Sequence, residues 1–438
     1  MPNYRHHIRV LDDIFREQFR PLPIDWNMGL RSEYFARPGK ALRPAFFYAS
    51  YLTFSDPDRR WLGYSQQALS PLQDTDIRRE LKFPLLWEIA NALEWLHLGI
   101  MAVDDAIDHG EHRRGGTSLY RLFEEHFRER IYHLPKERGE YTISPVAAVV
   151  NTLTWNMVDL WERVVWVNGQ PLESFNIAGQ ALLMPNGREG HYDFDHQPAT
   201  HDIFGHLQRV ISSVAGWKTH EKSTLQLMQE IYLTALQETL DGEKKDIEWS
   251  SRPDFPTIDE LFQIQDGKTS WYSVILPLSL GAILGQGENK AEILRALYDL
   301  GIWFGRAFQI IDDMLIIEAP DKAGKDTRSD LANGSKTTVI ILQGEMMAEP
   351  ERQEWADLLD LCKTSAEAQG KAIRIIENSG VINRCQQVAA ECVAHCDSAL
   401  ATIESLGYDS NLLRQLVRDG LHWMDDAKID TIDKPKPG

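Results

Sequence analysis

Residues 94–117 contain the side chains best suited to chemistry, because an apolar stretch ends there in carboxylates and arginines. Asp104 and Asp108 are four residues apart, so one turn of a helix places both on the same face, and His97 is two turns earlier on that face. Carboxylates this close together, Asp105 included, repel one another unless a cation lies between them. Mg²⁺ prefers oxygen ligands of this kind and is commonly completed by substrate phosphates, so the stretch predicts a metal–phosphate site.

Basic residues follow the carboxylates and strengthen this interpretation. Arg113 and Arg114 offer planar, bidentate donors for phosphate oxygens. Lys40 and Arg43 precede an apolar helical stretch and predict an anion site at its start, although two ordinary surface cations explain that pair equally well. An acidic cluster taken alone is more often a solvated helix end, and a second similar stretch weakens that alternative.

The second stretch is Phe308–Gln309, followed by Asp312–Asp313 and a polar, lysine-containing loop over residues 324–337. Two helices that end in paired aspartates can face one cavity when they run antiparallel. Carboxylates from both walls would then hold metal ions at the mouth of an apolar pocket. The chemistry that this arrangement supports is ionisation of a diphosphate ester, with the leaving group stabilised by metal and arginine.

Composition limits the possible functions. The chain has 438 residues, 43% hydrophobic and 25% charged, which is typical of a globular protein. Its net charge of −19 argues against a nucleic-acid-binding role. The four cysteines match no zinc-site spacing and predict reduced thiols in a cytoplasmic protein. We expect neither a signal segment nor a membrane span, because no run of about 18 apolar residues is present.

Helical periodicity dominates the chain and strand patterns are weak, which predicts an all-α fold with one domain over residues 1–438, larger than a four-helix bundle. Helices are expected over residues 4–20, 28–54, 83–109, 117–131, 146–167, 207–249, 257–285 with an interruption at Pro277, 290–317 and in several segments of 338–430. Polar insertions are predicted near residues 55–82 and 185–206, and a disordered tail at 431–438. Four histidines five residues apart in the second insertion share no helix face, so we favour a solvated loop over a metal site there.

The motifs, in this order and spacing, resemble those of the trans-isoprenyl diphosphate synthases, the family of farnesyl and geranylgeranyl diphosphate synthases. The resemblance covers roughly residues 35–345. Its motifs are Gly39–Lys40–x–x–Arg43–Pro44, Glu94–x–x–His97, Asp104–Asp105–x–x–Asp108 with Arg113–Arg114, Gly242–Glu243–x–x–Asp246, Lys268–Thr269, Phe308–Gln309–x–x–Asp312–Asp313 and Gly324–Lys325 with Asp330 and Lys336. The resemblance implies an isoprenoid-synthase bundle with a central apolar cavity, and a homodimer.

The resemblance also implies a role for each residue in these motifs. Three Mg²⁺ ions would be held by Asp104, Asp105, Asp108, Asp312, Asp313 and Asp246. The allylic diphosphate would be gripped by Arg113, Lys268 and Lys325, with Asp330 and Lys336 in the lid, and isopentenyl diphosphate by Lys40, Arg43, His97 and Arg114. Thr269 and Gln309 would lie near the allylic cation. The reaction would be a head-to-tail condensation, and the product length would depend on Gly99 and Ile100, four to five residues before Asp104.

Some features depart from the family pattern and keep two alternatives open. Ile316 stands where the second motif usually has its third carboxylate, which Glu318 could partly replace, and the C-terminus lacks an arginine cluster. A terpene cyclase on the same fold would tolerate the altered motif but has no use for a second diphosphate site. A non-catalytic regulatory subunit would be expected to lose an aspartate of the first motif, and none is lost.

Overall fold

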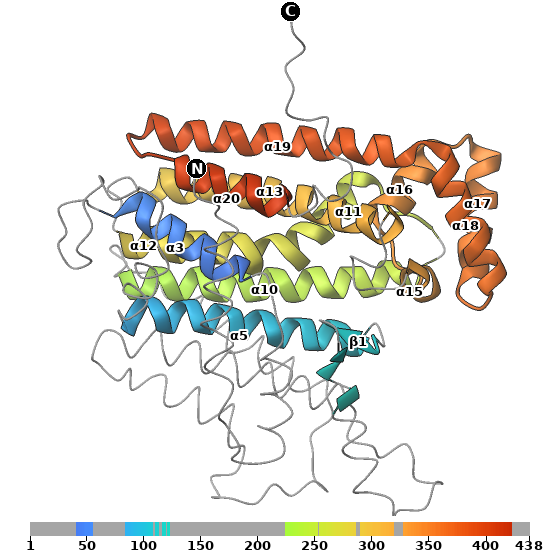
Figure 1. The fold of residues 1–438 in the computed structure, drawn as a ribbon, viewed down its shortest axis with the longest axis horizontal. Helices are drawn as coiled ribbons and strands as arrows, with labels where there is room; N and C mark the ends of the chain where they lie inside the picture. Colours follow the sequence, from blue (N-terminus) through green and yellow to red (C-terminus); the bar gives the residue numbers. More distant parts are fainter. Residues whose placement is uncertain are drawn as a thin grey trace, which may run out of the picture.

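The computed structural model is a bundle of long helices, as predicted (Figure 1). It describes residues 41–55, 84–107, 110–113, 116–119, 121–122, 224–252, 254–285, 290–318 and 327–422. The predictions for residues 4–20, 146–167, 185–206 and the tail, and almost all of those for 55–82 and 117–131, therefore lie outside the described residues. No helix in the described part is long and apolar enough to cross a membrane.

The first half of the described chain supplies four helices and a small hairpin. The helices are α3 (Leu42–Phe54), α5 (Pro84–Ile107), α10 (Thr224–Ser250) and α11 (Ile258–Gln265). A two-residue antiparallel ladder pairs β1 (His112–Arg113) with β2 (Gly116–Thr117) directly after α5. This hairpin was not predicted, because two residues per strand are too few to show a periodic pattern.

The central segment of the chain is the least regular. A ten-residue π-helix, η4 (Asp266–Ile275), continues from α11 and passes into α12 (Leu276–Gly285). The predicted interruption at Pro277 is wrong, since the chain stays helical from η4 through Pro277 into α12. The missing N–H group of this proline falls where the backbone changes from π-helical to α-helical geometry. Helix α13 (Lys290–Glu318) follows and confirms the predicted segment 290–317.

The C-terminal half consists of shorter helices and one long one. They are α15 (Thr327–Asn333), α16 (Thr338–Glu345), α17 (Glu349–Cys362), α18 (Ala366–Ser379), α19 (Val381–Ser405) and α20 (Asn411–His422). The predicted loop over 324–337 is wrong in part, because α15 forms within it. Side-chain caps explain where α16 and α18 begin. The Thr337 side chain accepts a hydrogen bond from the Ile340 N–H group, and the Ser365 side chain accepts one from the Ala368 N–H group.

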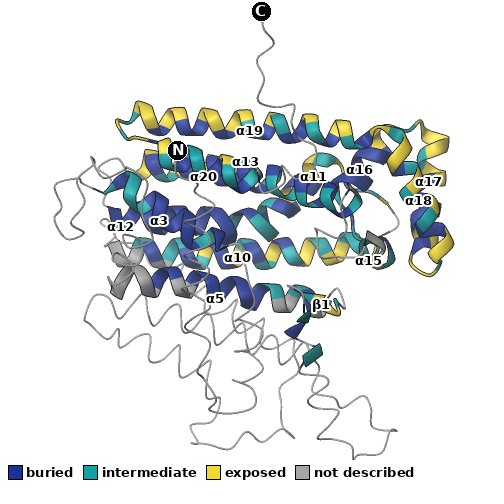
Figure 2. Cartoon of the chain, in the orientation of Figure 1, coloured by how far each residue is buried: buried dark blue, intermediate teal, exposed yellow. Residues whose placement is uncertain are grey.

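Two apolar clusters hold these elements together. One joins α3, α5, α10, α12, α13, α19 and α20, and the other joins α13 to α16–α19 at the end of the bundle where α17 and α18 lie (Figure 1). Helix α13 contributes to both clusters and packs along α19. Figure 2 shows the result, with inner faces buried and an exposed stripe along α10 and α19. The central cavity stays a prediction, since residues 146–167, for which a helix is predicted, lie outside the described residues.

All four cysteines lie in this C-terminal half, buried and free of disulfides. Burial raises the pKa of the Cys362 and Cys396 thiols, and that of Cys392 to about 11. The expectation of reduced thiols is therefore confirmed for the whole set.

Candidate active site

Three carboxylates converge on the ammonium group of Lys268 at one end of α10. Lys268 Nζ lies 3.0 Å from Asp104 Oδ1, 2.9 Å from Asp246 Oδ2 and 3.2 Å from Glu243 Oε2. Asp104 belongs to α5, the two other acids to α10 and the lysine to η4, so three helices meet at this point. The structure therefore brings together residues of the first aspartate motif, the Gly242–Glu243–x–x–Asp246 motif and the Lys268–Thr269 motif, which the family resemblance assigned to one site.

Close backbone contact positions Lys268. A β-carbon placed on Gly242 would lie 2.7 Å from the carbonyl carbon of Gly267, and one on Gly267 would lie 2.8 Å from the Cα of Gly242. Real β-carbons do not approach other atoms so closely, so only two glycines allow α10 and η4 to pack here. The π-helical geometry of η4, which is rare and often found at functional sites, sets the direction in which Lys268 and Thr269 leave the backbone.

Arg113 binds the first aspartate pair from the other side. Its Nε donates to Asp105 Oδ1 at 2.7 Å, and its Nη2 lies 3.1 Å from Asp104 Oδ2. The Asp104 side chain is 18% exposed, whereas that of Asp105 is 1% exposed. The hairpin β1–β2 carries Arg113 back to the end of α5. Asp104 thus faces the open side of the site, and Asp105 serves mainly to hold the guanidinium group.

The second aspartate motif is joined to η4 and α16 by neutral hydrogen bonds. The Thr269 hydroxyl donates to Gln309 Oε1 at 3.2 Å, and Gln309 Nε2 donates to Asp313 Oδ1 at 2.9 Å. The Thr338 N–H group donates to Asp313 Oδ2 at 2.7 Å. Asp313 is buried, whereas Asp312, one residue earlier, is partly exposed. Thr269 and Gln309 are adjacent, as predicted, and Asp313 links the helices.

Burial shifts two carboxyl groups of the site. Desolvation raises the pKa of Glu243 to about 7, against the opposing effect of Lys268, and Asp104 and Asp246 raise it further. Desolvation also raises the pKa of Asp313 to about 7, although three hydrogen bonds from Thr338 and Gln309 favour its ionised form. Raised pKa values of this kind are frequent at active sites, where burial and neighbouring charges act on groups that bind ligands.

A separate polar group surrounds Arg43 on α3. Its Nη2 donates to the Tyr272 hydroxyl at 3.1 Å and to Ser273 Oγ at 2.7 Å, and its guanidinium carbon lies 4.9 Å from the centroid of the Tyr272 ring. Arg43 Nε is buried and has no hydrogen-bond partner in the described part of the chain. His97 stacks on the Tyr272 ring, with the two ring centroids 6.1 Å apart. The predicted residues Arg43 and His97 are therefore brought together.

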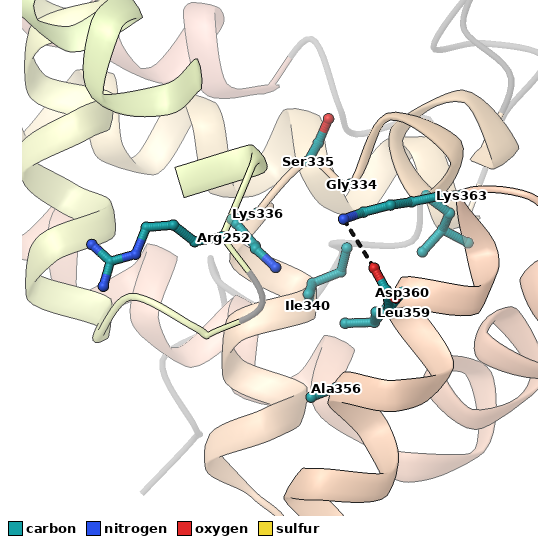
Figure 3. A pocket seen from close by; sticks show the side chains of 10 residues that line it. Arg252, Gly334, Ser335, Lys336, Ile340, Ala356, Leu359, Asp360 and Lys363 are labelled. Atoms are coloured by element: carbon teal, nitrogen blue, oxygen red, sulfur yellow. Dashed lines mark ion pairs between the residues drawn. The ribbon is translucent and has the colours of Figure 1, made fainter. Parts of the chain in front are cut away.

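The remaining predicted residues lie apart from these clusters or outside the described part of the chain. Gly99 and Ile100 are buried on α5, Asp330 lies on α15, and Lys336 lies in a recess between α15 and α17 (Figure 3). Lys40, Asp108, Arg114 and Lys325 lie outside the described residues. No prediction for these four is tested.

The model of the polyprenyl synthetase family matches residues 26–127 and 197–376, which is more than half of the sequence. The chain belongs to the polyprenyl synthetase family. Similarity to individual proteins is lower: the geranylfarnesyl diphosphate synthase of Natronomonas pharaonis is 29% identical over 190 residues, covering 42% of this chain and 50% of that relative. The match thus spans about half the length of the relative.

Solved structures of other family members share the fold. A polyprenyl synthase from Caulobacter crescentus, complexed with calcium and isoprenyl diphosphate, superposes with a TM-score of 0.62 at 16% identity, covering 96% of this chain and 95% of that one. A geranylgeranyl pyrophosphate synthase from Corynebacterium glutamicum, complexed with isoprenyl diphosphate and magnesium, gives 0.59 at 18% identity, covering 95% and 96%. At these identities the likeness establishes the polyprenyl-synthetase fold alone.

The donor set of this family member fits a hard divalent cation in part. Asp104, Glu243 and Asp246 offer carboxylate oxygens and, with Asp105, outnumber the cations Lys268 and Arg113. This surplus of negative charge would repel a diphosphate unless additional cations were bound. Within the described residues, however, no three potential ligands surround one common metal position. The carboxylates of Asp105 and Asp313 accept hydrogen bonds from Arg113 and Thr338, and they do not face one common metal position.

Sequence reasoning missed several residues of the site. Glu243 was noted as part of a motif, but its contact with Lys268 was not predicted. The contacts of Arg43 with Tyr272 and Ser273 were not predicted either. The hydrogen bond from Thr338 to Asp313 was also missed. Each of these contacts joins residues that are 25 to 230 positions apart. Glu243 could have been found, because it precedes Asp246 by three residues and therefore shares its helix face.

Proposed function

We propose that this polyprenyl synthetase condenses isopentenyl diphosphate head-to-tail with an allylic diphosphate and requires Mg²⁺. The observation that carries the proposal is the position of Lys268, held by Asp104, Glu243 and Asp246 and next to the Thr269–Gln309 hydrogen bond. When bound, Mg²⁺ would supply the positive charge that stabilises a departing diphosphate. Asp104, Asp246 and Asp312 are the described carboxylates that we expect to hold it, together with Asp108.

Different residues of this chain would then bind the two substrates and face the allylic cation. Lys268 and Arg113 would exchange part of their carboxylate contacts for phosphate oxygens and so orient the allylic diphosphate. The oxygen atoms of Thr269 and Gln309 would face the allylic cation. Arg43, whose buried Nε awaits an acceptor, would hold the second diphosphate together with His97, Lys40 and Arg114. Released diphosphate would accept the proton lost from the product.

The direct test is product analysis. The protein would be incubated with Mg²⁺, isopentenyl diphosphate and each allylic diphosphate of five, ten or fifteen carbons in turn, and products would be identified before and after phosphatase treatment. A longer prenyl diphosphate supports the proposal. A hydrocarbon formed from one allylic substrate alone would indicate a terpene cyclase, which the buried Ile316 in the second motif would permit. No turnover with any substrate would indicate a regulatory subunit.

We further propose a product of about twenty carbons, because Gly99 leaves space on α5 and each additional buried CH₂ group gains about 0.8 kcal/mol. Gly99 and Ile100 are both buried one turn before Asp104. A Gly99→Phe substitution should shorten the product by at least one isoprene unit, while ionisation of the allylic substrate continues. An unchanged product distribution would place the floor of the pocket elsewhere.

A further inference from the structure

The π-helix η4 packs against α10 on one side and against α13 on another. On the α10 side, the contact of Gly242 with Gly267 brings the two backbones together. On the α13 side, Asp266, the first residue of η4, forms an ion pair with Arg306. This pair is separate from the carboxylates that converge on Lys268, and the function proposed above does not use it.

The ion pair of Asp266 and Arg306 is bidentate. Arg306 Nε donates to Asp266 Oδ1 at 2.8 Å, and its Nη2 donates to Oδ2 at 2.6 Å. The two side chains are only 18% and 15% exposed. Two parallel N–H···O bonds fix the orientation of a carboxylate as well as its distance, which a single ammonium group does not do. The first residue of η4 therefore has a defined position relative to α13.

Aromatic rings hold the guanidinium group of Arg306 in turn. Its central carbon lies 4.8 Å from the centroid of the Phe262 ring on α11 and 4.7 Å from that of the Trp303 ring on α13. The Trp303 ring stacks on His395 of α19, with the ring centroids 3.9 Å apart and the planes inclined by 13°. A planar guanidinium group stacks on such rings, whereas a lysine would offer only a point charge. Three helices therefore fix Arg306, and Arg306 fixes η4.

This ion pair defines geometry more than it adds stability. Desolvation raises the pKa of Asp266 although Arg306 favours the ionised form, so ion pairing does not fully offset the cost of removing the carboxylate from water. Replacement of both partners of such a pair by apolar residues often leaves stability unchanged. A role in specifying the position of η4 accounts for the pair better than a contribution to stability.

The position of Asp266 determines that of Lys268. Side chains two residues apart on a helix point to nearly opposite sides, so Asp266 faces α13 while Lys268 faces the carboxylates of α5 and α10. Thr269 follows, and its hydroxyl group donates to Gln309 on α13. A shift of the first turn of η4 would therefore move both Lys268 and Thr269.

The other end of η4 is fixed by a different contact. A β-carbon on Gly305 would overlap the Ser270 side chain, and one on Gly301 would overlap that of Ile275, so α13 and η4 are in close contact beyond Lys268. The two residues that bind Arg43 lie in this part of η4. Loss of the ion pair should therefore disturb the start of η4 more than the surroundings of Arg43.

We propose that Arg306 is a positioning residue for the reaction: through Asp266 it holds the start of η4 so that Lys268 and Thr269 meet the allylic diphosphate. The inference rests on the proposed function, since the allylic diphosphate is the ligand that Lys268 would bind. Reacting groups must be held closely, and a misplacement of about 1 Å far from the chemistry can lower a rate about a hundredfold.

The test replaces both partners at once. The double variant Asp266→Leu/Arg306→Met removes the ion pair without leaving an unpaired charge, so its free energy of unfolding should stay close to that of the unmodified protein. We expect kcat to fall about tenfold to a hundredfold and KM for the allylic substrate to rise, while KM for isopentenyl diphosphate stays within about twofold. Unchanged kinetics in this stable variant would overturn the proposal, because a purely structural ion pair predicts that result.

Arg306→Lys is the conservative variant, and it decides the question if the double variant does not fold. It keeps the positive charge but loses the bidentate hydrogen bonds and the stacking, so kcat should still fall about tenfold or more. The matched control is Arg295→Met, which removes one charge from an exposed position of α13 and should leave kcat unchanged. Full activity of Arg306→Lys, or an equal loss in Arg295→Met, would contradict the positioning role.

Hydrogen exchange separates this inference from the proposed function. The amide protons of residues 267–270 should exchange faster in the double variant than in the unmodified protein, whether or not prenyl substrates are condensed. Absence of turnover by the unmodified protein would count against the proposed function, whereas unchanged exchange in the double variant would overturn the role of Arg306.

Discussion

The two Asp–Asp pairs of this protein share one pattern but have different surroundings. In each pair the first residue, Asp104 or Asp312, is partly exposed, and the second, Asp105 or Asp313, is buried. Asp105 is held by the guanidinium group of Arg113, whereas Asp313 is held by an amide and a backbone N–H group. The comparison leads us to propose that the dipeptide separates two tasks, an outward acid for ligands and an inward acid for the fold. Among the described residues, only the first pair has a cation beside its buried acid.

The largest effect is expected at the outward acid of the first pair. Asp104→Ala should lower kcat/KM about a thousandfold or more, because a carboxylate that would hold the cation, and that orients both Lys268 and Arg113, is lost. Steady-state assays with Mg²⁺ and both substrates would measure this. Asp105→Ala is the matched comparison and should instead lower the free energy of unfolding by about 1–3 kcal/mol. If both variants lost stability and activity alike, the division of tasks would be wrong.

Lys268 tests the charged character of the first region. Lys268→Met should lower kcat/KM by about 10²–10³, the usual effect of losing one donor aimed at developing charge. Lys244→Met is the control on α10, since that lysine is exposed and, among the described residues, forms its ion pair with Glu248. Its activity should stay within about twofold of the unmodified protein, because a surface ion pair contributes little. Equal losses in the two variants would show a general charge effect.

The glycine contact tests whether backbone packing positions Lys268. Gly242→Ala should lower the free energy of unfolding by about 1–3 kcal/mol, since the added methyl group forces α10 and η4 apart. Gly370→Ala is the control, because a β-carbon there has its nearest atom, Arg374 Nη1, at 3.6 Å. That variant should gain about 0.5–1 kcal/mol from improved helix propensity. Chemical denaturation would measure both, and a stable Gly242→Ala variant would contradict the packing argument.

The smallest effect concerns the inward acid of the second pair. Burial raises the pKa of Asp313 from 3.8 to about 7, so the folded protein keeps a proton that the unfolded chain has lost. Stability should therefore fall as pH rises from about 4 to 7 and then level off, by roughly 1 kcal/mol or more between pH 5 and 7. Urea denaturation of metal-free protein would measure this slope. Asp313→Asn should flatten it, and an unchanged slope would assign it to other groups.

Sequence patterns predicted the parts of this site that depend on local spacing. The helices that carry His97 and Asp104, and Gln309 and Asp313, follow from apolar periodicity and from separations of three, four and seven residues. The contact of Lys268 with Asp104 spans 164 positions and depends on how helices pack, which periodicity does not encode. The π-helix was equally hidden, because one extra residue per turn changes the apolar pattern too little over ten residues.

Local spacing also failed to predict the partly buried ion pair of Asp266 and Arg306. Their bidentate hydrogen bonds of 2.8 and 2.6 Å tie η4 to α13 across 40 positions. Arg306 additionally lies over the rings of Phe262 and Trp303. The sequence around each residue does not indicate an ion pair. A single arginine on an apolar helix face and a single aspartate before a glycine are both common on protein surfaces.

The burial of all four cysteines has a practical consequence for labelling. Thiol reagents attack the thiolate, and these side chains are both shielded from solvent and, for Cys362, Cys392 and Cys396, disfavoured as thiolates. The natural chain thus provides a background of low reactivity toward maleimides. A single cysteine introduced at Leu361, an exposed position on α17 close to Asp360, would accept a fluorophore selectively. Its emission would report on the α17–α18 end of the bundle during turnover, without any native thiol having to be removed.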